Sequence, residues 1–423
     1  MYKKIVLDNG IRVILNPMPA MESAAIGVWI AAGSRNETKR ISGASHFLEH
    51  MIFKGTPTMT SRRIKEEIEG RGGSLNGFTS EEMTCYLAKV SARHIDIALS
   101  VLSEMVLHAH LNQKEVERER TVIVQEIKMY HDLPNHHVHD ILNALMWPRH
   151  PLGFPVAGDI RSVRSITRHD LMDYKKTNYI PKNIALVLCG NLDQDKVMQG
   201  INRIFRFNVK KKPAPCAGFN NAQSQPQMKV LRKDTKQAHI SMGLHAFGRM
   251  HEDRYKLTLL HIIMGANMSS RLFENIREKR GLAYEIGTEI KRYKGTGAFI
   301  VNAGTEHSKA KKVISLALKE LKKVRESTIP EKELKRAKEY FRVQFSLALE
   351  NTMDHMLWLG ERVVASGRLP EKDKIIKEVN SVSAQDLQCV AKDVFRAKNL
   401  NLAMIGPVRD REKKELEEEL GEL

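Results

Sequence analysis

An internal repeat is the feature that most restricts the fold of this chain. Residues 181–190 (PKNIALVLCG) match residues 397–406 (AKNLNLAMIG) at an offset of 216. Both contain a Lys-Asn pair, alternating apolar residues and a closing glycine, a pattern that predicts a turn leading into a β-strand. Residues 114–118 and 332–336 also match, at an offset of 218. Chance is the alternative for two short matches, but their similar offsets and common order favour two tandem copies of one α/β unit.

A linker separates the two copies. Residues 209–227 are rich in Pro, Asn, Gln and Lys and have no apolar periodicity. The sequence therefore predicts a first domain over 1–208, a linker over 209–227 and a second domain over 228–423. Near the N-terminus, Asn9-Gly10 between two apolar stretches predicts a β-hairpin.

Each half alternates short β-rich stretches with long amphipathic helical patterns. The β-rich stretches comprise 24–32, 84–90, 184–189, 238–245, 298–303 and 400–405. The helical patterns comprise about 95–107, 113–130 and 331–348. Because no glycine-rich phosphate-binding motif follows a strand, a dinucleotide or nucleotide site is not indicated. We predict an α+β fold of two tandem homologous domains, each a mainly antiparallel sheet covered by helices.

Residues 46–50 (HFLEH) carry the clearest chemical signal. On a helix, His46 and His50 project from the same face and can bind one metal ion, and Glu49 lies beside them. Zinc held by imidazoles acidifies a water molecule, and an adjacent carboxylate can accept the proton. A catalytic zinc needs a third protein ligand, for which Glu119 and Glu126 are candidates. They are seven residues apart, so both lie on one face of the predicted helix.

This pattern resembles the pitrilysin or insulinase type of zinc metallopeptidase, which has an inverted HxxEH motif. The spacing along the chain from His50 to Glu126 also matches that family. Residues 72–86 (GGSLNGFTSEEMTCY) resemble its GGxxNAxTxxxxTxY segment, with Gly77 in place of the usual alanine, and residues 270–284 (SRLFENIREKRGLAY) resemble its SRLFxxxRExxGLxY segment. The similarity is greatest to the two-domain bacterial members that resemble mitochondrial processing peptidase.

The resemblance implies a role for each matching residue. His46, His50 and Glu126 are expected to bind one Zn²⁺ per chain, with Glu49 as the general base and Glu119 supporting the zinc site. A strand near Asn76 to Thr84, containing the substrate-binding residues Asn76, Gly77 and Thr79, is expected to pair with an extended peptide. From the second domain, Arg277 and Tyr284 are expected to hold the substrate and stabilise the oxyanion.

The resemblance also implies an assembly and an activity. The two domains are expected to close like clam-shell halves, and family members of this length act as dimers, so we expect a homodimer or a heterodimer with a paralogue. The second domain is expected to be inactive, because residues 260–264 (LHIIM) lack a second histidine. The predicted function is a zinc-dependent endopeptidase for extended peptides or presequence-like segments. A noncatalytic partner subunit of the same fold is the alternative.

Charge suggests a third class of function. The net charge is +18, from 68 Lys and Arg against 50 Asp and Glu, which raises RNA or an anionic membrane as partners. Residues 1–208 carry 27 basic and 22 acidic side chains (net +5), and residues 209–423 carry 41 and 28 (net +13). No nucleic-acid-binding motif accompanies this excess, so we predict neither a nucleic-acid partner nor a membrane partner. Four scattered cysteines and the absence of a secretory apolar segment favour the cytoplasm.

Several residues also have plainer interpretations. Glu119 and Arg277 can be helix surface charges, Asn76 a turn residue and Tyr284 a core aromatic. The histidines at 131, 136, 137 and 139 lie beside Pro134 in an apparent loop, where a second metal site is the alternative to a solvated loop. Acidic residues at 66, 67, 69, 81 and 82 lie near the predicted substrate segment, where they are candidates for binding basic presequences.

Overall fold

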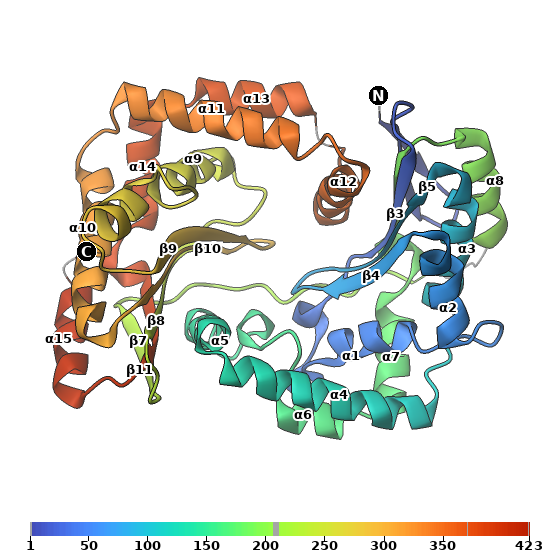
Figure 1. Ribbon diagram of the computed structural model, residues 1–423, viewed down its shortest axis with the longest axis horizontal. Coiled ribbons are helices and arrows are strands. Elements are labelled where there is room, and N and C mark those ends of the chain that lie inside the picture. Colours follow the sequence, from blue (N-terminus) through green and yellow to red (C-terminus); the bar gives the residue numbers. More distant parts are fainter. Residues whose placement is uncertain (1, 206–210, 370, 422) are drawn as a thin grey trace. The chain divides into compact units, whose positions relative to one another are not determined.

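The computed structural model describes residues 2–205, 211–369, 371–421 and 423 (Figure 1). They form two compact units, and each unit takes residues from both halves of the sequence. Unit 1 comprises the described residues of 1–128, 154–217 and 346–370, and unit 2 those of 129–153, 218–345 and 371–423. The expected boundary at 208–209 and residue 210 of the expected linker lie outside the described residues, whereas residues 211–226 contain no helix or strand.

The sheet of unit 1 has six strands among the described residues, in the order β1-β2-β6-β3-β5-β4. Their bounds are β1 Lys3–Val6, β2 Arg12–Pro17, β3 Ser23–Ile30, β4 Ser74–Thr79, β5 Thr84–Ser91 and β6 Ile184–Gly190. The β2 and β6 strands are parallel, and all other neighbours are antiparallel. The β1–β2 hairpin that Asn9-Gly10 predicts is confirmed.

The sheet of unit 2 repeats this arrangement. Its five described strands follow the order β7-β11-β8-β10-β9, which corresponds to β2-β6-β3-β5-β4. Their bounds are β7 Gln227–Arg232, β8 Ala238–Ala246, β9 Glu285–Arg292, β10 Gly297–Thr305 and β11 Leu400–Gly406. The β7 and β11 strands are parallel, like β2 and β6 in unit 1, and the other neighbours are antiparallel. The predicted α+β fold of two homologous halves with mainly antiparallel sheets is therefore confirmed.

Helices cover both sheets. In the first half of the sequence they are α1 Ala44–Ile52, α2 Ser61–Ile68, α3 Ile95–His108, α4 Gln113–Asp132, α5 Pro134–Met146, α6 Ile160–Ser165, α7 Arg168–Asn178 and α8 Gln194–Ile204. In the second half they are α9 Arg254–Met264, α10 Ala310–Glu326, α11 Glu331–Leu347, α12 Thr352–Ser366, α13 Lys372–Ser381, α14 Ala384–Val394 and α15 Asp410–Leu420. Within the described ranges, no helix combines the length and apolar character needed to cross a membrane.

The unit 1 sheet is buried on both faces. Side chains of β3 alternate, so that Ile26 and Val28 pack with α1, α3, α7 and α8, whereas Ala25 and Trp29 point to the opposite face. On that opposite face they meet Met356, Leu359 and Val363 of α12. A helix from the second half of the sequence therefore completes the core of the unit that carries the HxxEH motif.

The exchange is reciprocal. The α5 helix, from the first half of the sequence, packs Val138, Leu142 and Met146 against Ile300 of β10 and Ile405 of β11 in unit 2. Helices α5 and α12 hold equivalent places in the order of the two repeats. In each half of the sequence, one helix therefore packs on the sheet of the other half. The expected domains, 1–208 and 228–423, are contiguous and do not include this exchange.

Contact between α12 and β3 is very close at Gly360. A Cβ atom at this position would overlap Cε2 and Nε1 of Trp29. Alanine normally favours a helix over glycine by about 1 kcal/mol, but overpacking a core costs about 1–3 kcal/mol. We expect Gly360→Ala to lower the thermal midpoint of unfolding, because the clash with the rigid indole outweighs the gain in helix propensity. Glu361→Ala, at the next and exposed position, is the control in differential scanning calorimetry; a Gly360→Ala midpoint at or above the wild-type value contradicts the expectation.

Two local expectations are wrong. The single strand expected near Asn76 to Thr84 is instead the end of β4 and the start of β5, because Ser80 N donates to Met83 O and closes a turn between them. The apparent loop at Pro134 is the first turn of α5, which carries His136, His137 and His139. Proline at the start of a helix loses no intrahelical hydrogen bond, so this residue begins the helix.

Candidate metal centre

The α1 helix displays its HxxEH residues along one stripe. Its other residues, including Phe47 and Leu48, are buried in the core, so His46, Glu49 and His50 lie on the remaining, partly buried face. The spacing i, i+3 and i+4 brings these three side chains together.

A buried carboxylate fixes the start of this helix. Glu37 accepts hydrogen bonds from the backbone N–H groups of Gly43 and Ser45, both at 2.7 Å, and from the Ser45 hydroxyl. Gly43 has φ +95°, and a Cβ atom there would lie 2.5 Å from the carbonyl oxygen of Ala157. Burial raises the pKa of Glu37 to about 8, although these hydrogen bonds oppose the shift. Glu37 and Gly43 therefore set the direction from which α1 leaves the preceding loop.

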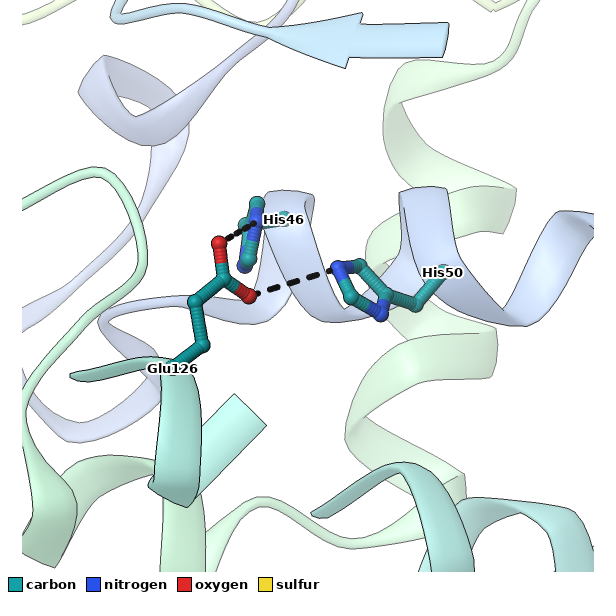
Figure 2. A group of neighbouring side chains, drawn as sticks. All are labelled: His46, His50 and Glu126. Carbon is teal, nitrogen blue, oxygen red and sulfur yellow. Dashed lines mark ion pairs between the residues drawn. The ribbon is translucent and has the colours of Figure 1, made fainter. Parts of the chain in front are cut away.

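Glu126 of α4 faces both histidines (Figure 2). Its Oε1 lies 3.8 Å from Nε2 of His46 and its Oε2 lies 3.7 Å from Nε2 of His50. One potential ligand atom from each residue lies within 4.8 Å of the other two. In the described part of the chain, this is the only such group of three or more His, Cys, Asp or Glu side chains.

The three side chains suit a zinc ion. Burial, and then the charge of His50, lower the pKa of His46 to about 3, so this imidazole is neutral near pH 7 as a metal ligand must be. Ligand atoms around a tetrahedral zinc with bonds of about 2.0 Å are roughly 3.3 Å apart. The separations of 3.7 and 3.8 Å are close to that value and too long for hydrogen bonds. The donor set therefore fits zinc.

His50 contacts the carboxylate of Glu119, which in turn contacts Lys54. Oε2 of Glu119 lies 3.1 Å from Nδ1 of His50, and Oε1 of Glu119 lies 2.5 Å from Nζ of Lys54. Glu119 is only 6% exposed, so it is no surface charge. A hydrogen bond from Nδ1–H to Glu119 leaves Nε2 of His50 free to face Glu126. In contrast, Nδ1 of His46 is buried without a hydrogen-bond partner among the described residues.

Glu49 is oriented by β4. The hydroxyl of Thr79 donates to Oε2 of Glu49 at 2.8 Å. Burial raises the pKa of the Glu49 carboxyl, the hydrogen bond from Thr79 and the charge of His50 lower it, and repulsion from Glu126 raises it further. A carboxylate with a raised pKa is better suited to accept a proton near neutral pH.

The β4 strand carries the other expected substrate-binding residues. Among the described strands β4 pairs only with β5, so it forms one edge of the sheet. Asn76 is exposed and its Oδ1 accepts from the backbone N–H of Gly77. A Cβ atom at Gly77 would lie 3.1 Å from the ring of Phe53, so an alanine at this position needs a small shift of that ring.

Arg277 and Tyr284 lie in unit 2. The guanidinium of Arg277 stacks on the ring of Phe273 at 4.7 Å. Tyr284 is 57% exposed, and its hydroxyl donates to Glu306 across 3.4 Å, so it is not the core aromatic of the plainer interpretation. Their action on a substrate stays a prediction.

The histidines at the end of α4 and the start of α5 do not form a second centre. The ring of His131 stacks on His137 with centroids 4.5 Å apart, and His136 contacts Tyr130. Among the described residues, these side chains do not belong to any group with three donors close enough for one metal ion.

Sequence reasoning missed Lys54 and Glu37. Lys54 lies two residues beyond the end of α1, so its contact with Glu119 depends on the turn after the helix and not on helical spacing. Glu37 has no signal in the sequence either, because its contact with α1 depends on the path of the loop between them.

Lys54 is expected to affect zinc affinity without touching the zinc ligands. Replacing Lys54 by methionine leaves the buried Glu119 carboxylate without its cation and removes one of the two contacts that hold Glu119 beside His50. Loss of such an outer contact costs about 10- to 100-fold in metal affinity. We expect that increase in the zinc dissociation constant, measured by chelator competition, with Lys54→Arg close to wild type. The exposed Lys65→Met variant is the control, and an unchanged constant for Lys54→Met contradicts the expectation.

A two-domain α+β fold with an HxxEH helix and a distant glutamate defines the class of inverted-motif zinc peptidases. Residues 12–160 match the family model described as "Insulinase (Peptidase family M16)", and residues 165–341 match the model described as "Peptidase M16 inactive domain". The chain therefore belongs to the insulinase family, peptidase family M16. The label of the second model agrees with α9, which lacks a second histidine at the place of HxxEH.

Relatives support the same assignment over the whole chain. The uncharacterized zinc protease YmxG of Bacillus subtilis is 35% identical over 408 residues, which cover 96% of this chain and 98% of the relative. An uncharacterized zinc protease of Streptomyces coelicolor is 32% identical over 416 residues, covering 97% and 90%. The crystal structure of a protease from Helicobacter pylori has the same fold, with a TM-score of 0.91, 22% identity and coverage of 96% and 99%.

Proposed function

We propose that this chain is a zinc-dependent endopeptidase that cleaves extended peptides, with Glu49 as the general base. One observation carries the proposal: Glu49 lies on the same stripe of α1 as the cluster of His46, His50 and Glu126, and Thr79 holds its carboxylate. A complete set of ligands and base favours this function over the noncatalytic subunit, which would lack one of them.

Each residue has a defined task in this proposal. His46, His50 and Glu126 hold one zinc ion, which acidifies a water molecule and polarises a carbonyl group when it is bound. Glu49 accepts the proton of the attacking water and transfers it to the leaving amine. Thr79 keeps the Glu49 carboxylate in one orientation through its hydrogen bond.

The β4 strand supports the choice of extended peptides as substrates. Its outer edge has no strand partner among the described residues, so its backbone groups can pair with a peptide chain. We assign Asn76 and Gly77 to this edge, and Arg277 and Tyr284 to the peptide backbone and the oxyanion. Main-chain pairing makes weak demands on substrate sequence.

Three of the five acidic residues near β4 give no support for a basic presequence as the substrate. Glu66 and Glu67 of α2 pair with Arg62 and Arg71, and Glu82 pairs with the buried Arg35. Because each of these carboxylates has an arginine partner, they do not present an unbalanced negative charge. We therefore favour extended peptides in general over presequence-like segments.

The proposal also includes a dimer and a localisation in the cytoplasm. The dimer, with a second copy or with a paralogue, rests on the family resemblance. The cytoplasm rests on four cysteines that are all free, which suits a reducing compartment.

Removal of the metal tests the proposal. Protein treated with a chelator is expected to lose hydrolysis of a quenched fluorescent peptide, and one equivalent of zinc per chain is expected to restore it. Zinc content is measured in parallel by mass spectrometry. Full hydrolysis by metal-free protein contradicts the proposal, and bound zinc without hydrolysis across a varied peptide set favours the noncatalytic subunit.

A further inference from the structure

Unit 1 contains a cavity with no role in the proposed reaction. Its volume is about 700 Å³, and it lies between the end of α3, the turn that follows, and α7. This volume is typical of sites that hold a small molecule. Among the described residues that line it, none belongs to the zinc cluster or to β4, and neither Glu49 nor Glu119 is included.

The walls of the cavity are basic. Arg168, Lys175 and Lys176 of α7 line it, and the described residues of its lining include no aspartate or glutamate. None of these three cations forms an ion pair with a described residue. The concentration of positive charge does not follow from composition, because residues 1–208 carry 27 basic and 22 acidic side chains. The cavity is therefore a local positive site in a nearly balanced part of the chain.

In the described part of the chain, no carboxylate forms an ion pair with Lys175. It is partly buried, and its Nζ donates to the carbonyl oxygen of Leu107 at 3.0 Å. Burial lowers the pKa of Lys175 to about 8. The carbonyl end of α3 carries only about half a negative charge, so it compensates the ammonium in part. A buried ammonium usually has an anionic partner, and here an anion in the cavity is able to supply it.

The turn beside Lys175 is held in an unusual conformation. Leu111 has φ +45°, which is uncommon for a residue other than glycine. Nε of Arg168 donates to the carbonyl oxygen of Leu111 at 2.6 Å, which fixes both the turn and the guanidinium. Such strain persists where the surrounding structure enforces it, often at binding sites.

Apolar side chains form the rest of the cavity. Met172 and Ile180 line it together with Leu107 and Leu111. Met172 is among the exposed large hydrophobic residues, whereas Ile180 is buried. This combination of apolar wall and cationic groups suits a ligand that has one charged and one apolar part.

We propose that this cavity binds a small amphipathic anion, with its carboxylate at Lys175 and Lys176 and its apolar body against Met172 and Ile180. A medium-chain fatty carboxylate has both of these parts. Nothing in this proposal depends on the reaction at the zinc cluster.

Isothermal titration calorimetry with decanoate tests the proposal. We expect saturable binding of one decanoate per chain, with decanol and inorganic phosphate each binding at least tenfold more weakly. Charge-assisted hydrogen bonds contribute about 1.5–3 kcal/mol, so Lys175→Met is expected to weaken decanoate binding by about tenfold or more. Lys176 is exposed, so Lys176→Met tests the same charge at a position that tolerates substitution. The exposed Lys65→Met variant on α2 is the matched control.

Three results overturn the proposal. The first is the absence of saturable decanoate binding to the wild-type protein. The second is wild-type affinity in both Lys175→Met and Lys176→Met, which is also the result if decanoate binds a metal at His46 and His50. The third is equal binding of decanol or phosphate, because the site then does not recognise an amphipathic anion. Peptide hydrolysis is measured separately, so the proposed function is tested independently.

Discussion

Glu49→Gln is expected to reduce peptide hydrolysis by about 10²- to 10⁴-fold, the usual contribution of a general base. Glutamine keeps the volume of the side chain and can still accept the hydrogen bond from Thr79, but it cannot take a proton from water. The expected zinc ligands His46, His50 and Glu126 are unchanged, so zinc is expected to stay bound. Initial rates with a quenched fluorescent peptide measure the effect.

Zinc content decides how the Glu49→Gln result is interpreted. The Glu66→Gln variant, at an exposed position of α2, is the control for loss of one negative charge. A slow variant that retains one zinc per chain supports Glu49 as the base. Activity within threefold of wild type, with zinc bound, shows that another group takes the proton and contradicts the assignment.

Glu126→Gln is expected to abolish zinc retention and hydrolysis together. The substitution removes the only carboxylate that faces Nε2 of both His46 and His50 in the described part of the chain. Two neutral imidazoles alone form an incomplete set for a catalytic zinc, which usually has three protein ligands. Because a ligand at 100 times its dissociation constant stabilises a protein by about 2.7 kcal/mol, the variant is also expected to lose the rise in thermal midpoint that zinc gives the wild type.

The matched control for Glu126→Gln is Glu117→Gln, which changes an exposed glutamate on the same helix. Both proteins are dialysed against the same zinc concentration and compared by mass spectrometry and by thermal unfolding with and without zinc. A Glu126→Gln protein that retains stoichiometric zinc shows that the third ligand lies elsewhere. The thermal unfolding of the metal-free variant is compared with that of the metal-free wild type, which shows whether the variant folds.

The sheets were largely predictable from the sequence. The stretches at 84–90 and 400–405 became β5 and β11 with shifts of one residue, because both are central strands whose buried residues form near-continuous apolar runs. The repeat of 181–190 at 397–406 placed equivalent strands beside equivalent partners. Edge strands such as β4 were harder to predict, since half of their side chains are exposed and their apolar pattern is weak.

The candidate site was predictable where helical geometry alone determined it. His46, Glu49 and His50 share a stripe because of their spacing, whereas their meeting with Glu126 depends on the packing of α4 and was reached only through the family resemblance. The contact between Lys54 and Glu119 joins the turn after α1 to α4, two segments that are distant in the sequence, and spacing within one helix does not reveal it. Thr79 was expected to bind substrate, and its hydrogen bond to Glu49 adds a contact that no linear motif contains.

The exchange of α5 and α12 was not predictable for a different reason. An amphipathic pattern such as that of Met356, Leu359 and Val363 shows that a helix will be buried on one side, but not against which sheet. Since the two sheets are homologous, either offers a similar apolar face. The choice depends on the path of the chain before and after the helix.

The position of α12 has a consequence for biosynthesis. Strand β6 ends at Gly190 and α12 ends at Ser366, so 366 − 190 = 176 further residues must be added before Trp29 and its neighbours are covered. At about 5–20 residues per second, translation of that stretch takes roughly 9 to 35 s. During this interval the nascent chain carries a sheet with one bare apolar face, a state that invites aggregation or chaperone binding. A gene truncated after the linker would encode the whole HxxEH motif and still yield a polypeptide without a finished core.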